Sequence, residues 1–295
     1  MAVHNGMPYL PKAMDSIMRQ SFQDFEAIVV DDHSTDCSDD WCRRVRDPRV
    51  RILEHSGKGQ TEALNAGLRA ARGEWIARMD ADDWSYPERI EEQIAAVTDT
   101  SVMISADYWL CDEDLETVAY IGLSNPSKRL YQYMRTRNNP LCHPVMMFRR
   151  QVALDAGGYD TSLRNAQDYD LWLRLLERGE LVHVTRSLLK YRVVRTSLSV
   201  ADQNQQELER RRSLGQSSTA TPMSAVTKAE REGLYRYKLG FGSWINGSRR
   251  RAWADLFSAA CTHRRLRLRA TILGLLLLVP RRWRLWLGGY RGVYR

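Results

Sequence analysis

The sequence predicts an α/β fold in which helices flank a mixed sheet, followed by a helical, basic C-terminal region. Up to about residue 195, short apolar runs rich in β-branched residues alternate with helical patterns, which is typical of a sheet with covering helices. The 295 residues, 43% of them hydrophobic, suffice to bury one large core or two small ones. The 18 glycines and 9 prolines form no periodic repeat, which excludes collagen-like and solenoid architectures.

The strands of this sheet are predicted from apolar runs that are bounded by turn residues. Four strands are expected at 27–30, 51–54, 75–79 and 102–106, and a later edge or mixed strand at 144–148. Met1-Ala2-Val3 has the pattern of the last half of one more strand, so we expect this first strand to be truncated.

Helices are predicted where apolar residues recur at helical spacing. They cover residues 10–20, 60–71, 87–97 and 168–178. The apolar face of the last helix is formed by Leu171, Trp172, Leu173, Leu175 and Leu176. Gly179 is its expected stop.

Composition divides the chain into three parts. Residues 1–196 form the α/β domain, the polar stretch 197–227 is a linker, and residues 228–295 form a helical region rich in Arg and Trp. The net charge of +8 is uneven, because residues 249–295 carry twelve arginines and one acid, which gives +11 there and leaves −3 for residues 1–248. A basic tail on a slightly acidic body favours contact with an anionic surface over general nucleic-acid binding.

Cysteine usage and apolar run lengths indicate the compartment. The five cysteines form no CxxC pair and are odd in number, so neither a disulfide framework nor a zinc cage is expected and a reducing cytosol fits best. The first five residues lack the features of a signal peptide, and no apolar run reaches the ~20 residues that span a bilayer. We therefore expect a cytoplasmic protein that contacts the inner face of the plasma membrane peripherally.

The first candidate site is the run VVDDHSTD at 29–36, an apolar strand that ends in Asp31 and Asp32. Nucleotides bind at the carboxyl ends of strands in open α/β sheets, where an acid accepts hydrogen bonds from a base or ribose. The alternative is that these residues only cap the next helix, with Ser34 or Asp36 at its N-cap.

The second candidate site is Asp80, Asp82 and Asp83, at the end of the strand predicted at 75–79. Three carboxylates so close together repel one another unless a cation neutralises them, and hard oxygen ligands around a diphosphate suit Mg²⁺ or Mn²⁺. The alternative is a solvated acidic turn before the helix that begins at Pro87.

The third candidate site is Asp168 and Asp170, which open the helix predicted at 168–178. A helix N-terminus stabilises an ionised carboxylate, which suits a base that must be charged at neutral pH. Simple capping is the alternative. Acids two positions apart do not share one helix face, so we expect the two to have different roles.

In this order the motifs resemble the family 2 glycosyltransferases, inverting enzymes of the GT-A fold, over about residues 1–195. The resembling segments are AVHNG at 2–6, FEAIVVDDHSTD at 25–36, GKG at 57–59, ALNAGL at 63–68, GEWIARMDADD at 73–83, HP at 143–144, GGYD at 157–160 and QDYDLWLRL at 167–175. The resemblance implies transfer of a sugar from a nucleotide-diphosphate sugar to a glycan or lipid-linked acceptor, in surface polysaccharide or glycolipid assembly.

The resemblance also implies roles in donor binding. Asp32 would bind the nucleotide base. The same pocket would be lined by Ala2, Val3, His4 and Asp31. Lys58, in its glycine-flanked loop, either reaches a phosphate or belongs to a flexible solvated loop.

The acidic turn would carry the cation in a DxD motif. Asp80 and Asp82, with Ala81 between them, would hold Mg²⁺ or Mn²⁺ on the sugar diphosphate, and Asp83 is an alternative ligand or sugar contact. The cation would offset the charge on the departing diphosphate, so no covalent enzyme intermediate is required.

On the acceptor side, Asp168 would be the general base that takes the proton of the attacking hydroxyl. The family commonly has an acid where Gln167 stands, so a hydrogen-bonding contact is expected there instead. His143 either lines the acceptor cleft or is structural. Cys142 has no partners for nucleophilic catalysis and is expected to be a small buried residue.

The tail alternates Arg with apolar residues from Arg264, continues through 272–279 and reaches RRWRLWL at 281–287. Arg and Trp around a short apolar core predict a segment that lies among anionic lipid headgroups. The alternative is a helix packed on the catalytic domain, with Arg stems covering apolar surface.

Three other functions compete with the transferase. A sugar nucleotidyltransferase needs a glycine-rich basic loop near the first strand, where only His4 and Lys12 occur. A non-catalytic glycosyltransferase-like binding module, recruited to a membrane or partner by its tail, is the main alternative, and retained Asp80, Asp82 and Asp168 argue against it. Nucleic-acid binding is disfavoured by the apolar run between the basic clusters.

Overall fold

The first of two sheets is parallel and holds the start of the chain. The computed structural model describes residues 1–55, 57–123, 129–136, 139–195, 209–210, 212–215, 228–246, 248–262, 270–272 and 274. The first sheet contains β1 (Ala2–Val3), β2 (Ala27–Asp31) and β3 (Val50–Glu54), with β2 in the middle. These strands confirm the predicted positions, including the short strand at the start.

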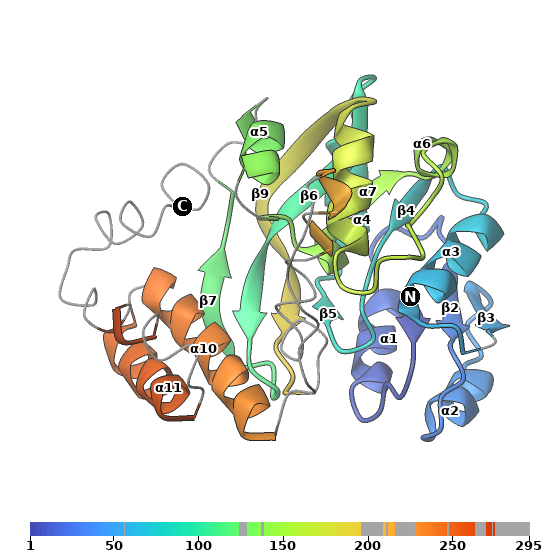
Figure 1. Cartoon of the computed structure of the whole chain (residues 1–295). Coiled ribbons are helices and arrows are strands. Elements are labelled where there is room, and N and C mark those ends of the chain that lie inside the picture. Colours follow the sequence, from blue (N-terminus) through green and yellow to red (C-terminus); the bar gives the residue numbers. More distant parts are fainter. Residues whose placement is uncertain are drawn as a thin grey trace.

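The second sheet has the strand order β4-β8-β6-β9-β5, with β7 paired to β6. Its strands are β4 (Trp75–Ala77), β5 (Trp84–Ser85), β6 (Ser101–Cys111), β7 (Thr117–Ile121), β8 (Met147–Arg149) and β9 (Glu180–Arg192). The neighbours β6 and β9 run parallel, whereas β8 is antiparallel to both β4 and β6. This sheet is therefore mixed, as predicted (Figure 1).

The four predicted helices are confirmed, and several short ones join them. The predicted helices are α1 (Leu10–Met18), α3 (Gln60–Ala70), α4 (Arg89–Ala95) and α7 (Gln167–Leu176). Those not predicted are α2 (Ser38–Arg44), α5 (Arg129–Thr136), the 3₁₀ helix His143–Val145 and α6 (Arg150–Asp155). None of these exceeds eight residues, which is too short for a repeated apolar spacing.

Four strands depart from the prediction, one by its position and three because they were not predicted. The strand expected at 144–148 begins only at Met147, because Pro144 lies in a 3₁₀ turn, and it lies between β4 and β6. Its antiparallel pairing fits a mixed strand, whereas an edge position was wrong. Strands β5, β7 and β9 were not predicted. In β9, charged residues such as Arg186 and Lys190 interrupt the apolar pattern.

The side chains of β2 alternate between two helical layers. Val29 belongs to a cluster with Leu10 of α1, whereas Val30 lies against Gly67 of α3, where a Cβ would stand 3.3 Å from a Val30 methyl carbon. Helices therefore cover both faces of the first sheet. The polar residues that follow β1 and β2 therefore lie at the carboxyl-terminal edge of this sheet, between the two helical layers.

A buried polar network joins β6, β7 and β9 behind the site. The Asp107 carboxylate accepts from His183 Nε2 at 2.7 Å and from the Tyr120 hydroxyl, and Ser105 Oγ lies 2.7 Å from His183 Nδ1. The side chains of His183 and Asp107 are 1% and 0% exposed. Because no substrate reaches such a buried serine, this Ser–His–Asp arrangement ties strands together rather than acting as a nucleophile.

The C-terminal helices α10 (Lys228–Asn246) and α11 (Arg249–Thr262) pack on each other and beside β7 (Figure 1). The cluster between α10 and the sheet is Leu234, Tyr235 and Leu239 with Val118 and Val193. The basic tail from Arg264 lies almost wholly outside the described residues. Within the described ranges, no helix has both the length and the apolarity that crossing a membrane requires.

Candidate functional site

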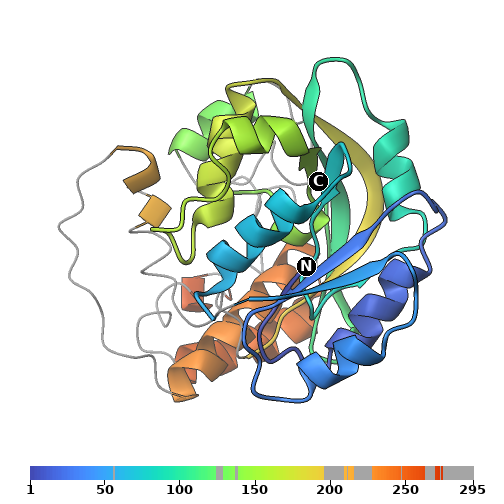
Figure 2. The same cartoon turned by 90° about the vertical axis from the view of Figure 1, so that its right-hand side faces the viewer.

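The carboxyl ends of β1 and β2 bring the predicted donor-binding residues together. Figure 2 shows the blue strands of this sheet beside the marked N-terminus. Val3 pairs with Asp31 in the parallel register, and the Ala2 pairing precedes it. His4 Nδ1 donates a hydrogen bond of 2.9 Å to the Asp32 carbonyl. The buried Asp31 carboxylate accepts from the Ser34 N–H at 3.1 Å. These residues therefore share one edge of the sheet.

Both carboxylate oxygens of Asp32 are bound within the protein. His55, just after β3, donates from Nδ1 to one oxygen at 2.7 Å, and the Gly59 N–H donates to the other at 2.9 Å. Asp32 thereby anchors the loop that carries the exposed Lys58. Each oxygen has a second lone pair, so Asp32 retains the capacity to accept a bond from a base. No sequence pattern marks His55, because a lone histidine after a strand is common.

Three carboxylates meet in the turn after β4. The ligand oxygens of Asp80, Asp82 and Asp83 lie within 4.8 Å of one another. Burial, together with the charge of Asp80, raises the pKa of Asp82 to about 7. Burial and the charges of Asp82 and Asp80 likewise raise the pKa of Asp83. Three ionised carboxylates are therefore unfavourable here unless a cation joins them.

Two arginines that no sequence pattern marks hold this acidic turn. Arg78 is buried and forms an ion pair with Asp80. Arg192, the last residue of β9, donates from Nε to the Asp82 carbonyl at 2.6 Å. The Arg192 backbone N–H donates to the Asp83 carboxylate at 2.8 Å. The turn is thus fixed by one cation directly after β4 and another from the distant strand β9.

The acidic turn fits a divalent cation. Asp83 is completely buried, and its Oδ2 atom has no hydrogen-bond partner within the described part of the chain. An orphaned carboxylate oxygen beside two further carboxylates is the all-oxygen donor set that Mg²⁺ or Mn²⁺ takes. Asp80 and Asp82 are only half-buried, so a cation held there would remain open to diphosphate oxygens.

Asp168 lies half-buried in the first turn of α7. Asn139 Nδ2 donates to Asp168 Oδ2 at 3.0 Å, and the Leu141 N–H fixes Asn139 by donating to its side-chain oxygen at 3.1 Å. Burial raises the pKa of Asp168 to about 6, against the lowering effect of backbone N–H groups and of Arg78. This carboxylate is therefore ionised at neutral pH yet basic enough to accept a proton.

The acidic turn and Asp168 influence each other electrostatically. The negative charge of Asp80 raises the pKa of Asp168, whereas the positive charge of Arg78 lowers it. Arg78 also contributes to lowering the pKa of His143, although burial is the larger cause. Arg78 is therefore the cation shared by the acidic turn and the helix that carries Asp168.

Asp170 has a partner of its own, one turn further along α7. Arg174 donates to the Asp170 carboxylate at 2.5 Å and to the carbonyl oxygens of Ala156 and Gly158 at 2.6 and 2.8 Å. Asp170 thus orients Arg174, which holds the loop between α6 and α7, and its partner differs from that of Asp168.

The remaining candidates have structural partners. His143 Nε2 and the Tyr159 hydroxyl share a hydrogen bond of 3.0 Å, and burial lowers the pKa of His143, so this imidazole is neutral. Burial raises the pKa of the Cys142 thiol, which keeps it un-ionised. Gln167 is buried and donates to Gln60 Oε1 at 3.3 Å, so it tethers α7 to the start of α3.

Glu209, within the stretch expected to be a linker, caps the loop before α7. It is completely buried. Its Oε2 atom accepts from the backbone N–H groups of Arg164, Asn165 and Ala166 at 2.9, 2.6 and 3.0 Å. A carboxylate bound by three amides at a helix N-terminus is strongly stabilised. Glu209 therefore sets the position at which the helix bearing Asp168 begins.

Glu209→Ala should lower the free energy of unfolding by about 3 kcal/mol, because three N–H groups, of which that of Ala166 is buried, lose a buried charged acceptor. Urea unfolding followed by circular dichroism measures this change. Glu116→Ala, at an exposed turn, is the matched control and should shift stability by less than about 0.5 kcal/mol. Equal losses in the two variants would show that Glu209 does not hold the loop.

The sequence is similar to known glycosyltransferases. The family model described as "Glycosyl transferase family 2" matches residues 1–158. The O-antigen biosynthesis glycosyltransferase WbnJ of Escherichia coli is 31% identical over 202 residues, which cover 65% of this chain and 78% of WbnJ.

Solved structures resemble the fold over nearly the whole chain. S. aureus TarS 1–349 in complex with UDP has a TM-score of 0.57 at 15% identity, covering 98% of this chain and 89% of that one. The mannosyltransferase PcManGT from Pyrobaculum calidifontis, in complex with GDP-Man and Mn²⁺, has a TM-score of 0.59 at 19% identity, covering 98% and 82%. At these identities the likeness establishes the fold alone.

Proposed function

The chain belongs to glycosyl transferase family 2 and has the GT-A fold, and on this premise we propose that it moves a sugar, with inversion, from a nucleotide-diphosphate sugar to an acceptor hydroxyl. One observation carries the proposal. The acidic turn of Asp80, Asp82 and Asp83 lies within electrostatic reach of Asp168. One site can therefore hold the donor diphosphate at the acidic turn and the acceptor hydroxyl at Asp168.

Asp168 is proposed as the general base. As the acceptor oxygen forms its bond to the anomeric carbon, the bond from that carbon to the diphosphate breaks, and the hydroxyl proton passes to the Asp168 carboxylate. Attack on the face opposite the leaving group inverts the configuration without a covalent enzyme intermediate. Asn139, which binds Asp168 Oδ2, keeps the carboxylate in one orientation during the transfer.

Asp80 and Asp82, with Asp83 beside them, are proposed to hold Mg²⁺ or Mn²⁺. When bound, the cation offsets the negative charge that builds on the departing diphosphate. Arg78 and Arg192 keep the acidic turn in place through their bonds to it. The GDP-Man and Mn²⁺ in the structure of PcManGT support this class of donor and cation.

The nucleotide is proposed to bind at the carboxyl ends of β1 and β2. Asp32 would contact the base, and the remaining pocket residues are Ala2, Val3, His4, Asp31 and Lys58, with Ala81 in the adjoining turn. The acceptor is proposed to be a glycan or a lipid-linked sugar in surface polysaccharide or glycolipid assembly. The O-antigen role named for WbnJ supports that class.

The experiment is release of nucleoside diphosphate from a panel of UDP-, GDP- and dTDP-sugars, each with Mn²⁺, Mg²⁺ or EDTA. We expect release from one donor class in the presence of a metal and its loss in EDTA. If folded protein released nothing from any donor, the non-catalytic binding module would replace the enzyme as the function.

We further propose that the C-terminal region rests on an anionic membrane surface at the cytosolic face. Trp253 and Phe257 of α11 are 44% and 63% exposed, and their spacing places them on one helix face. Arg250, on the same helix, is exposed as well. Exposed aromatic rings with neighbouring arginines suit the headgroup region of anionic lipid.

Replacing Trp253 and Phe257 together by Ser should weaken binding to phosphatidylglycerol vesicles by about tenfold or more, because two apolar side chains no longer enter the interface. Vesicle co-sedimentation measures the partition coefficient. Phosphatidylcholine vesicles and the Glu116→Ala variant are the controls. Unchanged sedimentation of the double variant would remove α11 from the membrane contact.

A further inference from the structure

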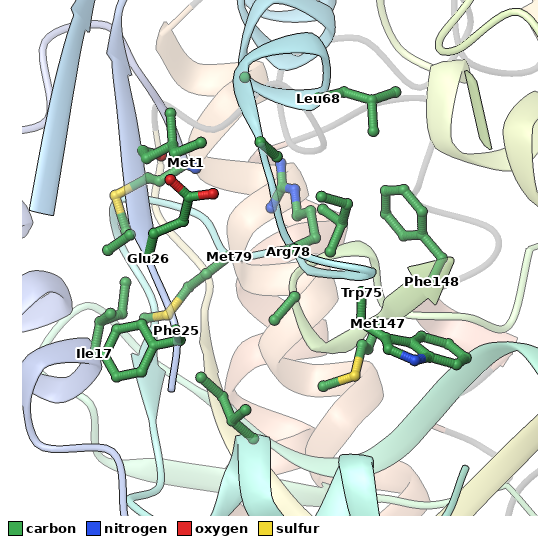
Figure 3. A pocket seen from close by; sticks show the side chains of 18 of the residues that line it. Met1, Ile17, Phe25, Glu26, Leu68, Trp75, Arg78, Met79, Met147 and Phe148 are labelled. Carbon is green, nitrogen blue, oxygen red and sulfur yellow. Dashed lines mark hydrogen bonds between the residues drawn. The ribbon is translucent and has the colours of Figure 1, made fainter. Parts of the chain in front are cut away.

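A cavity of about 460 Å³ separates the two sheets. Residues 26–30, from β2 and the residue before it, line one side, and residues 73–79, around β4, line the other. Figure 3 shows Met1 and Glu26 on one side of it and Trp75 and Phe148 on the other. The cavity continues the line of β1, which is only two residues long and borders the first sheet.

One side of the cavity is the edge of β2. The Val30 N–H donates to the Met1 carbonyl at 2.8 Å, as the Asp32 N–H does to Val3 at 2.7 Å. Because backbone groups alternate along a strand, the N–H groups of Glu26 and Ile28 point to the same side, into the cavity. On this side, that part of β2 has no strand beside it among the described residues, whereas its other side pairs with β3.

The opposite side is the edge of β4. The Arg78 N–H donates to the Met146 carbonyl at 2.9 Å, on the side where β8 pairs. By the same alternation, Trp75 and Ala77 direct their backbone groups away from β8 and toward the cavity. In the described part of the chain, β4 pairs only with β8. Two strand edges with unused hydrogen-bonding groups therefore face each other.

The two remaining walls come mainly from helices and are largely apolar, although Arg89 of α4 also lines the cavity. Leu64 and Leu68 of α3 lie on one wall, and Ile17 of α1 with Ile90 and Ile94 of α4 contribute apolar side chains as well. A space bounded by two strand edges and by helices has the shape of one strand within a helix-covered sheet. A small soluble ligand would leave the backbone groups at the edges without partners.

The amino group of Met1 supports a peptide occupant. It is partly buried and donates to the Ile28 carbonyl at 2.8 Å. Burial and the positive charge of Arg78 lower the pKa of this ammonium to about 5. A backbone amide N–H at the same position would make the same hydrogen bond without a buried charge.

We propose that the cavity between β2 and β4 is the seat of one more length of β-strand, contributed by residues that directly precede Met1 in a longer form of this chain. Continuing the register in which Ala2 pairs with Val30, about four such residues run parallel to β2, beside Ile28 back to Phe25. They join the two sheets into one with the order β3-β2-β1-β4-β8-β6-β9-β5.

The proposal fixes the chemistry of the added strand. Because both of its faces meet helices, its residues are apolar throughout, as in a buried parallel strand, rather than alternating with polar ones. Proline is excluded at positions that donate to β2 or β4. The inference concerns the fold and stands whether or not the proposed catalysis is correct.

The test compares three proteins: the 295-residue chain, the same chain with Val-Ile-Val-Ile placed before Met1, and the same chain with Ser-Gly-Ser-Gly there. Hydrogen–deuterium exchange is followed in peptides that cover residues 25–30 and 73–79. We expect the apolar extension to raise Tm by about 5 °C or more over the polar one. It should also slow exchange at Glu26, Ile28, Trp75 and Ala77 by about tenfold or more.

Equal Tm values for the two extended proteins would overturn the proposal, because the cavity would then not require an apolar strand. A higher Tm with unchanged exchange in residues 73–79 would overturn it too, since the extension would be stabilising some other surface. Slower exchange at both edges with the apolar extension alone supports it. Circular dichroism shows that all three proteins are folded.

Discussion

Asp168→Asn should lower the rate of sugar transfer by about 10²- to 10⁴-fold, the range that a general base contributes. The amide has nearly the shape of the carboxylate and still accepts the hydrogen bond from Asn139, so the site remains assembled. It does not take the proton of the attacking hydroxyl. Steady-state kinetics with the identified donor and acceptor should therefore show a fall in kcat with little change in donor KM.

The pH dependence of the rate should also differ between the wild type and Asp168→Asn. Because burial raises the pKa of Asp168 to about 6, its carboxylate is protonated below that pH and ionised above it. The wild-type rate should thus rise as pH increases through about 6 and then level off. In Asp168→Asn this rise of the rate with pH should disappear.

Asp155→Asn, an exposed acid on α6, is the matched control and should keep both the rate and the pH profile. If Asp168→Asn kept more than about a tenth of the activity, Asp168 would not be the general base.

Asp82→Asn should lower metal-dependent release of the nucleoside diphosphate by about 10³-fold, because the cation loses a ligand and the leaving group loses its electrostatic partner. The residual rate should equal that of the wild type in EDTA. Asp99→Asn, an exposed acid at a turn, is the control and should behave as the wild type does.

Although Asp82→Asn should lower the rate, it should raise the stability of the metal-free protein. An acid whose pKa is raised from 3.8 to about 7 destabilises the fold as pH rises through that interval, because ionisation favours the unfolded chain. Asn removes the repulsion from Asp80 and Asp83, so the free energy of unfolding in EDTA at pH 7 should rise by about 1 kcal/mol or more. If the Asp82 carboxylate stabilised the fold without a cation, urea unfolding would instead show a lower free energy of unfolding for Asp82→Asn.

Local patterns in the sequence predict the strand ends and their acids. Strand β2 and helix α7 each have a strong periodic signal, and the acids at their ends follow within a few residues. Local sequence patterns therefore suffice to predict Asp32, Asp82 and Asp168 as candidate site residues, because strand and helix termini are the positions at which backbone and charge are exposed together.

The partners of these acids could not be found in this way, because they are distant in the chain. Arg192 meets Asp82 across 110 residues, and Asn139 meets Asp168 across 29. Glu209 reaches Arg164 across 45 residues from a polar stretch whose composition indicates only a linker. Such contacts depend on strand order and on loop paths, which hydrophobic periodicity does not encode.

The proposed reaction is a single displacement, with Asp168 on one face of the sugar and the diphosphate held at Asp80 and Asp82 on the other. The most direct test is proton NMR of the sugar product formed at early times from an α-linked nucleotide sugar. We predict that the wild-type protein forms the β-anomer first. An initial α-anomer would contradict this mechanism, because it would require two displacements and a covalent or ion-pair intermediate at this site.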